Sequence, residues 1–204
     1  MSEFAMKNLT AGQLNAIVKK LGGEEGVLKF LRDELVISEA VVKQLLERLP
    51  ATIGIPAITS FTANKHFVPD TSRKAKVKIS CLSDDFKKHF LAKVDKSKVV
   101  AENLVVNRLL KSSLSPGIIA ALGGESKVEI TIGQFFAVFA KQPNCEDGTL
   151  LTNGYANVGY VRNINGVLLV VFGFRWLDNG WFFGARPLDD PEDWYVDGTQ
   201  FLSH

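Results

Sequence analysis

The chain has 204 residues, of which 46% are hydrophobic and 23% charged, with a formal net charge of +2 at pH 7. This composition is ordinary for a soluble globular protein of one or two domains. The longest uninterrupted apolar run, residues 167–172, is far shorter than the roughly 20 residues that cross a bilayer, so we expect no transmembrane helix and no membrane partner.

The N-terminus lacks the apolar core of a secretory signal, and its second methionine suggests that residues 1–5 are a cloning remnant before a native start at Met6. The two cysteines, Cys81 and Cys145, have no C-x-x-C spacing, so neither a disulfide scaffold nor a zinc cage is indicated. We therefore expect a cytoplasmic protein.

The small net charge conceals a segregation along the chain. Residues 1–64 carry 7 basic and 7 acidic side chains, whereas residues 65–111 carry 12 basic against 5 acidic, a net +7. Residues 142–204 carry 3 basic against 8 acidic, a net −5, and hold all three Trp and all three Tyr. This asymmetry permits a polyanion-binding face, although the two regions could equally neutralise each other when packed together.

Three short amphipathic helices are predicted in the first fifty residues. The first starts at the capping box of Thr10 and Gln13 and ends at Gly22-Gly23, and the second starts at Glu24. The third runs from Ser38 to Pro50. Residues 6–50 are thus expected to form a helical unit that packs on the rest of the chain, on a partner or in a homo-oligomer, and residues 51–204 an α+β domain. On this division, deleting residues 1–50 leaves a folded domain that has lost an interaction.

The middle of the chain mixes strands and helices. Alternation predicts a half-buried strand over 75–81, with Cys81 in the core, and Ser83 then caps a helix. A second strand is expected near 103–110. Ser115-Pro116 opens a short helix that ends at Gly123-Gly124, and Thr131 with Gln134 forms a capping box before a helix over 132–141.

The last fifty residues predict a β-meander. Asn-Gly and Asp-Gly pairs at 153–154, 165–166, 179–180 and 197–198 favour two-residue hairpins between antiparallel strands near 155–163, 167–176 and 181–186. Both faces of 167–176 are apolar, so its aromatic residues are expected in the core. The predicted fold is α+β, with an N-terminal short-helix unit, a mixed middle and a C-terminal antiparallel meander packed on a helix.

Residues suited to catalysis are scattered. His66, His89 and His204 lack metal-ligand spacing, and residues 189–193 suggest a solvated acidic turn. The acidic neighbours of Cys145 should raise the pKa of its thiol. No nucleotide-binding or hydrolase motif is present, so we predict no metal and no cofactor and assign no catalytic residue.

Two groups of side chains suit binding. Lys76 and Lys78 on the predicted strand, with Lys87 and Lys88 on the helix after it, would contact phosphates if both rows share one face; the alternative is a solvated edge. Exposed aromatic rings of the meander would stack on bases or sugars.

Three stretches carry a resemblance to a known family: Gly22-Gly23-Glu24-Glu25-Gly26-Val27-Leu28-Lys29-Phe30-Leu31-Arg32-Asp33-Glu34-Leu35, Gly117-Ile118-Ile119-Ala120-Ala121-Leu122-Gly123-Gly124-Glu125 and Gly148-Thr149-Leu150-Leu151-Thr152-Asn153-Gly154-Tyr155-Ala156-Asn157-Val158. With them the chain resembles, from Met6 onward, a family of uncharacterised small proteins encoded by bacteria of candidate phyla. The resemblance implies a bacterial, cytoplasmic origin and brings no activity, cofactor or catalytic residue with it.

The leading functional prediction is a non-enzymatic binding or regulatory protein whose partner is a nucleic acid or another protein. The alternative is a hydrolase or nuclease in which folding brings His66 or His89 next to carboxylates of the acidic C-terminal region. The two hypotheses differ in whether those side chains meet around a pocket.

Overall fold

The structure is a computed structural model that describes residues 15, 18–19, 23–31, 45–93, 96–177, 180–196 and 198–204. The chain divides into two compact units, Met1–Val41 and Val42–His204.

In the first unit the described residues are helical except for Gly23. Helix α2 spans Glu24–Leu31, as expected, with Glu24 and Glu25 at its N-terminal end, where the helix dipole favours negative charge. The helix end expected at Gly22-Gly23 is marked by Gly23, which has a φ of 82° and donates its N–H to the carbonyl of Val18. Most of the first predicted helix and residues 38–44 of the third lie outside the described residues, and self-association of this unit stays a prediction.

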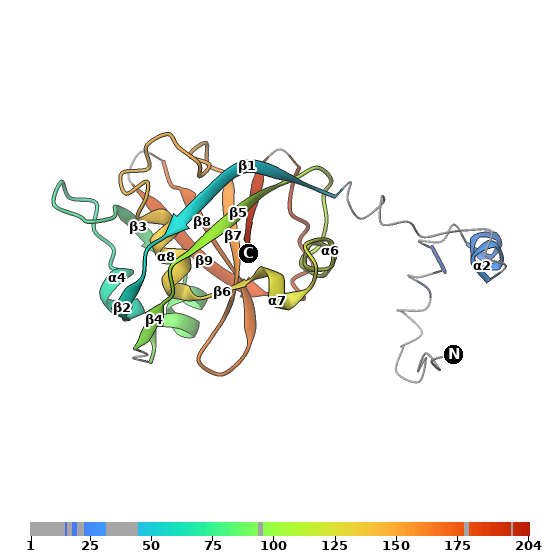
Figure 1. The fold of residues 1–204 in the computed structure, drawn as a ribbon, viewed down its shortest axis with the longest axis horizontal. Helices are drawn as coiled ribbons and strands as arrows, with labels where there is room; N and C mark the ends of the chain where they lie inside the picture. The colour runs from blue at the N-terminus through green and yellow to red at the C-terminus, as the bar shows by residue number, and fades with distance from the viewer. Residues whose placement is uncertain are drawn as a thin grey trace. The chain divides into compact units, whose positions relative to one another are not determined.

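The second unit is built of short helices around a large sheet (Figure 1). Its strands are β1 (Leu46–Ile55), β2 (Ile58–Phe61), β3 (Ile79–Leu82), β4 (Ser97–Val99), β5 (Glu102–Leu109), β6 (Glu129–Ile130), β7 (Ala156–Arg162), β8 (Leu168–Arg175), β9 (Trp181–Pro187) and β10 (Thr199–Ser203). Its helices are α4 (Ala63–His66), α5 (Asp84–Phe86), the π-helical turn η2 (Lys87–Leu91), α6 (Ser115–Ala121), α7 (Glu125–Val128) and α8 (Ile132–Phe139). None of the helices in the described part of the chain has the length and apolarity needed to cross a membrane.

The predicted α+β class is confirmed, and the sheet is mixed. Its strand order is β1-β5-β10-β7-β8-β9-β3, with β6 also paired to β7. Strands β7, β8 and β9 are antiparallel neighbours, whereas β10 and β6 lie parallel to β7 and β3 lies parallel to β9. Strands β7, β8 and β9 therefore lie inside a larger sheet, between β10, which follows β9 in the chain, and β3, which comes from the middle of the chain.

The helix predicted up to Pro50 is wrong in its last residues, and the boundary expected at residue 50 falls inside β1. Residues 46–55 pair antiparallel with β5, and the register shifts between Arg48 and Thr52. Because β1 is the edge strand, Pro50 costs the sheet no ladder hydrogen bond at this irregularity. The apolar spacing of Leu45, Leu46 and Leu49 suits a helix, but pairing with β5 overrides it.

Helix α8 lies against the sheet and is buried along its length after Ile132. The predicted capping box is present: the Gln134 N–H donates to Thr131 Oγ1, and the Thr131 N–H donates to Gln134 Oε1. Glycines of the sheet allow the close approach of the helix, since a Cβ at Gly159 would lie 3.0 Å from Phe135 and one at Gly173 would lie 2.5 Å from Phe139. The rings of α8 and β9 belong to the first core, the larger of two clusters of buried apolar side chains, and in Figure 1 α8 lies beside β1 and β9.

The opposite face of the sheet is only partly covered, which corrects the expectation for residues 167–176. Ile118 and Val128 of α6 and α7 join Leu168 and Val170 in a second core. Further along β8, Phe172 and Phe174 are only partly buried and Trp176 is 47% exposed. The aromatic side chains at the end of this strand therefore lie at the protein surface and not in the core.

The turn between β7 and β8 is one residue longer than expected. The Asn163 N–H donates to the Val167 carbonyl and the Gly166 N–H donates to the Asn163 carbonyl, which closes a three-residue loop. Gly166 has a φ of 79°, the left-handed conformation that such a loop requires at its last residue. Polar side chains of this loop line a cavity on the surface of the unit.

Candidate functional site

The basic middle segment, residues 65–111, includes the end of α4, the loop between α4 and β3, and the π-helical turn η2. Ser83 caps α5 by accepting the Phe86 N–H, as predicted, and the helix continues as a π turn in which the Ala92 N–H donates to the Lys87 carbonyl. Phe86 and Phe90 point into the core. Of the intervening residues of η2, Lys88 and His89 border a cavity.

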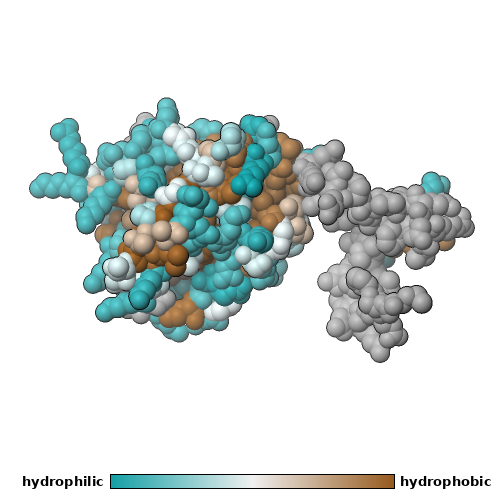
Figure 2. Space-filling view, in the orientation of Figure 1, coloured by the Kyte–Doolittle hydropathy of each residue, from teal (hydrophilic) through white to brown (hydrophobic). Residues whose placement is uncertain are grey.

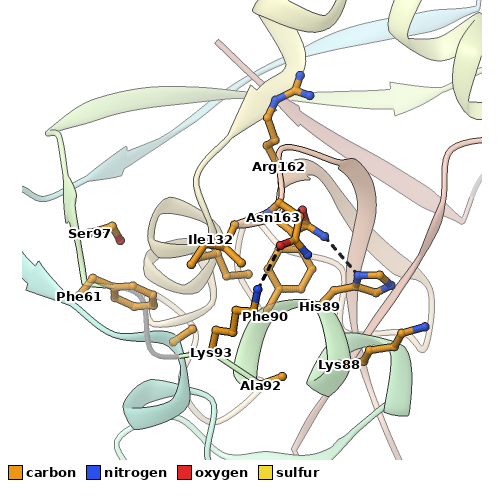
Figure 3. Close-up of a pocket in the computed structure, with 13 residues that line it drawn as sticks. Phe61, Lys88, His89, Phe90, Ala92, Lys93, Ser97, Ile132, Arg162 and Asn163 are labelled. Carbon is orange, nitrogen blue, oxygen red and sulfur yellow. Dashed lines mark hydrogen bonds between the residues drawn. The ribbon is translucent and has the colours of Figure 1, made fainter.

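The first cavity has a volume of about 80 Å³ and an apolar floor formed by Phe61, Phe90 and Ile132 (Figure 3). Its polar side is formed by two elements far apart in the sequence, η2 with the residues after it and the β7–β8 loop. The polar lining residues are Lys88, His89, Lys93, Ser97, Arg162, Asn163 and Asn165.

The buried amide of Asn163 fixes the tautomer of His89. Asn163 Oδ1 accepts the backbone N–H groups of Asn165 and Val167, each at 3.0 Å, so its Nδ2 must be the atom 3.2 Å from His89 Nδ1. Since an amide nitrogen only donates, His89 accepts at Nδ1 and carries its proton on Nε2. In this arrangement Nδ1 of His89 is occupied by Asn163, and Nε2–H is the donor that the ring offers.

The cations at this cavity differ in how they are engaged. Lys93 Nζ lies 3.3 Å from Asn165 Oδ1. Arg162 is directed away from Lys93 and His89 (Figure 3), and its guanidinium binds Glu129 and Glu125 at 2.8 and 3.0 Å. These hydrogen bonds, to Glu129 first and then to Glu125, raise the pKa of Arg162 above its ordinary value. Arg162 thus belongs to a surface ion-pair network, whereas Lys88 and Lys93 have no carboxylate partner among the described residues.

A second, wider cavity of about 570 Å³ lies on the other side of α4. Its basic lining residues are Lys65, Lys74 and Lys76. Ala63 of α4 borders the first cavity and Lys65 the second, so the short helix separates the two. The other lining residues are His66, Val68, Asp70, Ala75, Val77, Phe136 and Ala140.

His66 and Asp70 are both engaged within the second cavity. His66 Nδ1 lies 2.8 Å from the Thr62 carbonyl, so it donates there, and the imidazole stacks on Phe61 at 4.4 Å between ring centroids. The backbone N–H of Ser72 donates to Asp70 Oδ1 and holds the pKa of that carboxyl below its ordinary value. The lining of the second cavity therefore combines the rings of His66 and Phe136 with three lysines and the Asp70 carboxylate.

The four lysines singled out from the sequence do not form one cluster. Lys76 borders the second cavity and Lys88 the first, while Lys87 pairs with Asp84 at 3.0 Å. Lys78 is half-buried, with its N–H bound to the Pro143 carbonyl and its carbonyl bound to the Trp181 N–H. The strand predicted over 75–81 begins only at Ile79, so the expected alternation of Lys76 and Lys78 along a strand is wrong.

Five lysines border the two cavities, and we call them the basic surface. None makes an ion pair with a described carboxylate, whereas Lys29, Arg108, Arg162 and Arg186 each do. Figure 2 shows hydrophilic side chains projecting from the end of the unit that carries α4 and the loop after it. The basic surface consists of Lys65, Lys74, Lys76, Lys88 and Lys93.

His66 and His89 do not meet the described carboxylates of the acidic C-terminal region. Among the described residues, neither cavity has a lining carboxylate from residues 142–204. Asp190 and Glu192 pair instead with Arg186. His204 lies between Glu102 Oε1 at 2.7 Å and the Glu129 carbonyl at 2.6 Å, so both its ring nitrogens are occupied. The arrangement required by the hydrolase alternative is not formed by these side chains.

Sequence reasoning missed Asn163, Asn165 and the grouping of Lys65 and Lys74 with Lys76. The excess positive charge of residues 65–111 was the available signal for the lysines. No local pattern indicates Asn163, because its contact with His89 joins residues 74 positions apart.

The two cysteines differ in environment: the core position expected for Cys81 is wrong, and the raised pKa expected for Cys145 is confirmed. Cys81 is exposed, because a register shift between Ile79 and Cys81 turns it away from the core. Cys145 is buried, and burial rather than its acidic neighbours is the main reason that the pKa of its thiol is raised to about 11. The environment of Cys145 raises the thiol pKa, which is the opposite of what activates a nucleophile.

We expect Cys145 to make the protein less stable at alkaline pH. Between about pH 9 and 11 the unfolded thiol ionises while the folded thiol keeps its proton, so the free energy of unfolding falls as pH rises, by at most about 1.4 kcal/mol per unit. Urea unfolding of the Cys145→Ala variant should show a shallower decline over this range, whereas Cys81→Ala should keep the parental slope. Equal slopes in the two variants would contradict the assignment.

Comparison of the chain with protein-family models, with curated proteins and with solved structures found no match.

Proposed function

We propose that this protein binds single-stranded nucleic acid through the basic surface. The observation that supports the proposal is the gathering of five lysines without described ion-pair partners around two neighbouring cavities. Binding of phosphates by such lysines releases condensed counterions, which provides affinity without any catalytic group.

The shapes of the cavities favour a single strand over a duplex. The second cavity is of the size that holds a small organic ligand, and the rings of His66 and Phe136 form part of its wall. An unpaired base can enter such a cavity, and a base within a duplex cannot. The smaller first cavity offers Lys93 Nζ as a donor to a phosphate, with Lys88 as a second cation on its rim.

Fluorescence anisotropy with labelled 20-nucleotide oligo-dT and oligo-U tests the proposal. We expect binding at low salt that weakens as salt rises, with a slope of log K against log salt near −3.5 if all five lysines contact phosphates, at about −0.7 for each. The triple variant Lys65→Gln, Lys74→Gln, Lys76→Gln should reduce the magnitude of the slope by about 2.

The matched control neutralises two exposed lysines that border neither cavity, as Lys127→Gln with Lys141→Gln. It should retain most of the affinity. Absence of binding to both strands at low salt, or an equal loss in the control, would overturn the proposal. A labelled duplex bound more tightly than either strand would also overturn the preference for single strands.

The hydrolase or nuclease alternative is tested with the same labelled strands. We expect them to stay intact on a denaturing gel after prolonged incubation with Mg²⁺ or Mn²⁺, because among the described residues no carboxylate of residues 142–204 lines either cavity beside His66 or His89. Cleavage that disappears in His66→Ala or His89→Ala would favour the enzyme instead.

A further inference from the structure

A third cavity lies on the partly covered face of the sheet and has a lining opposite in character to the basic surface. Its volume is about 270 Å³. Five aromatic side chains line it together with two carboxylates and one arginine. We call it the aromatic cleft: the rings are Tyr155, Phe172, Phe174, Trp194 and Tyr195, and the charged residues are Arg186, Glu192 and Asp193.

Two of the five rings of the cleft, Tyr155 and Tyr195, are exposed. Tyr155 is 50% and Tyr195 74% exposed, whereas Phe139, Trp181 and Phe183 on the other face are fully buried. Beyond the cleft the row continues through Phe182, which stacks on Phe174 at 4.8 Å between centroids, to Trp176 at 5.7 Å from Phe182. The surface is therefore longer than a single small ligand.

The cleft already holds one guanidinium of the chain itself. The Arg186 guanidinium carbon lies 3.9 Å above the centre of the Trp194 ring, and Nη1 lies 3.3 Å from Glu192 and 3.7 Å from Asp190. A ring face combined with carboxylates is the environment that binds a delocalised cation. The internal arginine shows that this environment is built here.

The remaining groups offer the same chemistry to a second cation. Asp193 is exposed and makes no ion pair within the described residues, and the Glu192 side chain is 81% exposed. Tyr155 and Tyr195 provide uncovered ring faces. With Arg186 and Asp190 included, the local charge is a net −2, so it attracts a cation and repels nucleic acid.

We propose that the aromatic cleft binds an arginine side chain presented on an extended segment of a partner protein. Arginine is favoured over lysine because its flat guanidinium stacks on a ring while it donates two hydrogen bonds to a carboxylate. The row that continues over Phe182 and Trp176 accommodates the residues flanking that arginine. The cleft is thus a protein-binding site separate from the basic surface.

The probe is a fluorescein-labelled peptide, Gly-Ser-Arg-Gly-Ser-Arg-Gly-Ser, compared with its lysine counterpart by anisotropy on the full chain. We expect saturable binding at least fivefold tighter for the arginine peptide. Asp193→Asn and Tyr195→Ala should each weaken it at least fivefold, whereas Tyr195→Phe should retain it. The matched control is Asp189→Asn, an exposed aspartate of the same segment that does not line the cleft.

Several outcomes would overturn the proposal. They are an absence of saturable binding, equal affinity for the lysine peptide, or loss of affinity in Asp189→Asn equal to that in Asp193→Asn. If free arginine amide binds as tightly as the peptide, the ligand of the cleft is a small cation and not a partner protein. If sedimentation shows that the chain self-associates and that Asp193→Asn abolishes this, the partner at the cleft is a second copy of the chain. Unchanged oligo-dT binding by Asp193→Asn supports the independence of the two sites.

Discussion

Replacement of Gly173 by alanine will lower the free energy of unfolding by about 3 kcal/mol, because the site has no room for a methyl group. A Cβ there would lie 2.5 Å from Phe139 Cζ and 2.9 Å from Phe183 Cε1. Both phenylalanines are fully buried, and each packs against the other at 4.8 Å between centroids. Neither ring has a free direction in which to move, so α8 must shift from the sheet.

Urea unfolding followed by tryptophan fluorescence measures this loss, and Gly54→Ala is its matched control. Gly54 also lies in a strand, but a Cβ there would meet only Asn103 Oδ1, at 3.4 Å. We expect Gly54→Ala to leave stability unchanged or to raise it by about 0.5 kcal/mol, because alanine restricts the unfolded chain.

A double-mutant cycle identifies Phe139 as the cause. Phe139→Leu removes the ring atoms that a Cβ at Gly173 would strike, so the combined variant should cost less than the two single changes added together. Additive costs, or a Gly173→Ala variant as stable as Gly54→Ala, would show that the contact between α8 and β8 is looser than the structure has it.

Elements whose ends carry their own chemical signals were predictable from the sequence. Thr131 and Gln134 form the capping box that starts α8, and Ser83 accepts the Phe86 N–H at the start of α5. In both cases the stabilising hydrogen bonds join residues three positions apart, so the local sequence contains all the partners.

Elements decided by distant partners were not predictable in the same way. Strand β3 begins at Ile79 because it pairs with Trp181 of β9, about a hundred residues later, and the shift in that pairing exposes Cys81. Strand β1 forms because it pairs with β5 at the edge of the sheet. Local periodicity contains no information about either partner.

The same distinction holds for the candidate sites. The positive charge of the middle segment indicated a polyanion-binding region, but its lysines are grouped by the path of the loop after α4 and not by strand alternation. The aromatic residues of β8 were expected in the core because both faces of the strand are apolar. Helices α6 and α7 pack on the first part of β8, at Leu168 and Val170, and the sequence does not show that the rest of this face of the strand is only partly covered.

A chain of residues 51–204 will be less stable than one of residues 42–204 by about 3 kcal/mol, because a cut at Pro50 splits β1. The three pairs that join residues 46–48 to residues 107–109 of β5 would be lost. Leu45 and Leu46 pack on the second core and Leu49 on the first, and removal of three partly buried leucines costs about 1 kcal/mol each. The exposed ion pair of Glu47 with Arg108 adds little.

Circular dichroism and urea unfolding of the two chains measure the difference directly. The variant Leu46→Ala with Leu49→Ala in the 42–204 chain is the control, since it keeps the β1 backbone and removes only the side chains. It should lose part of the stability that the 51–204 chain loses, because the backbone pairing with β5 is retained. If the 51–204 chain unfolds at the same urea concentration as the 42–204 chain, residues 46–50 contribute nothing to the sheet, and the boundary of the folded unit lies at Pro50 after all.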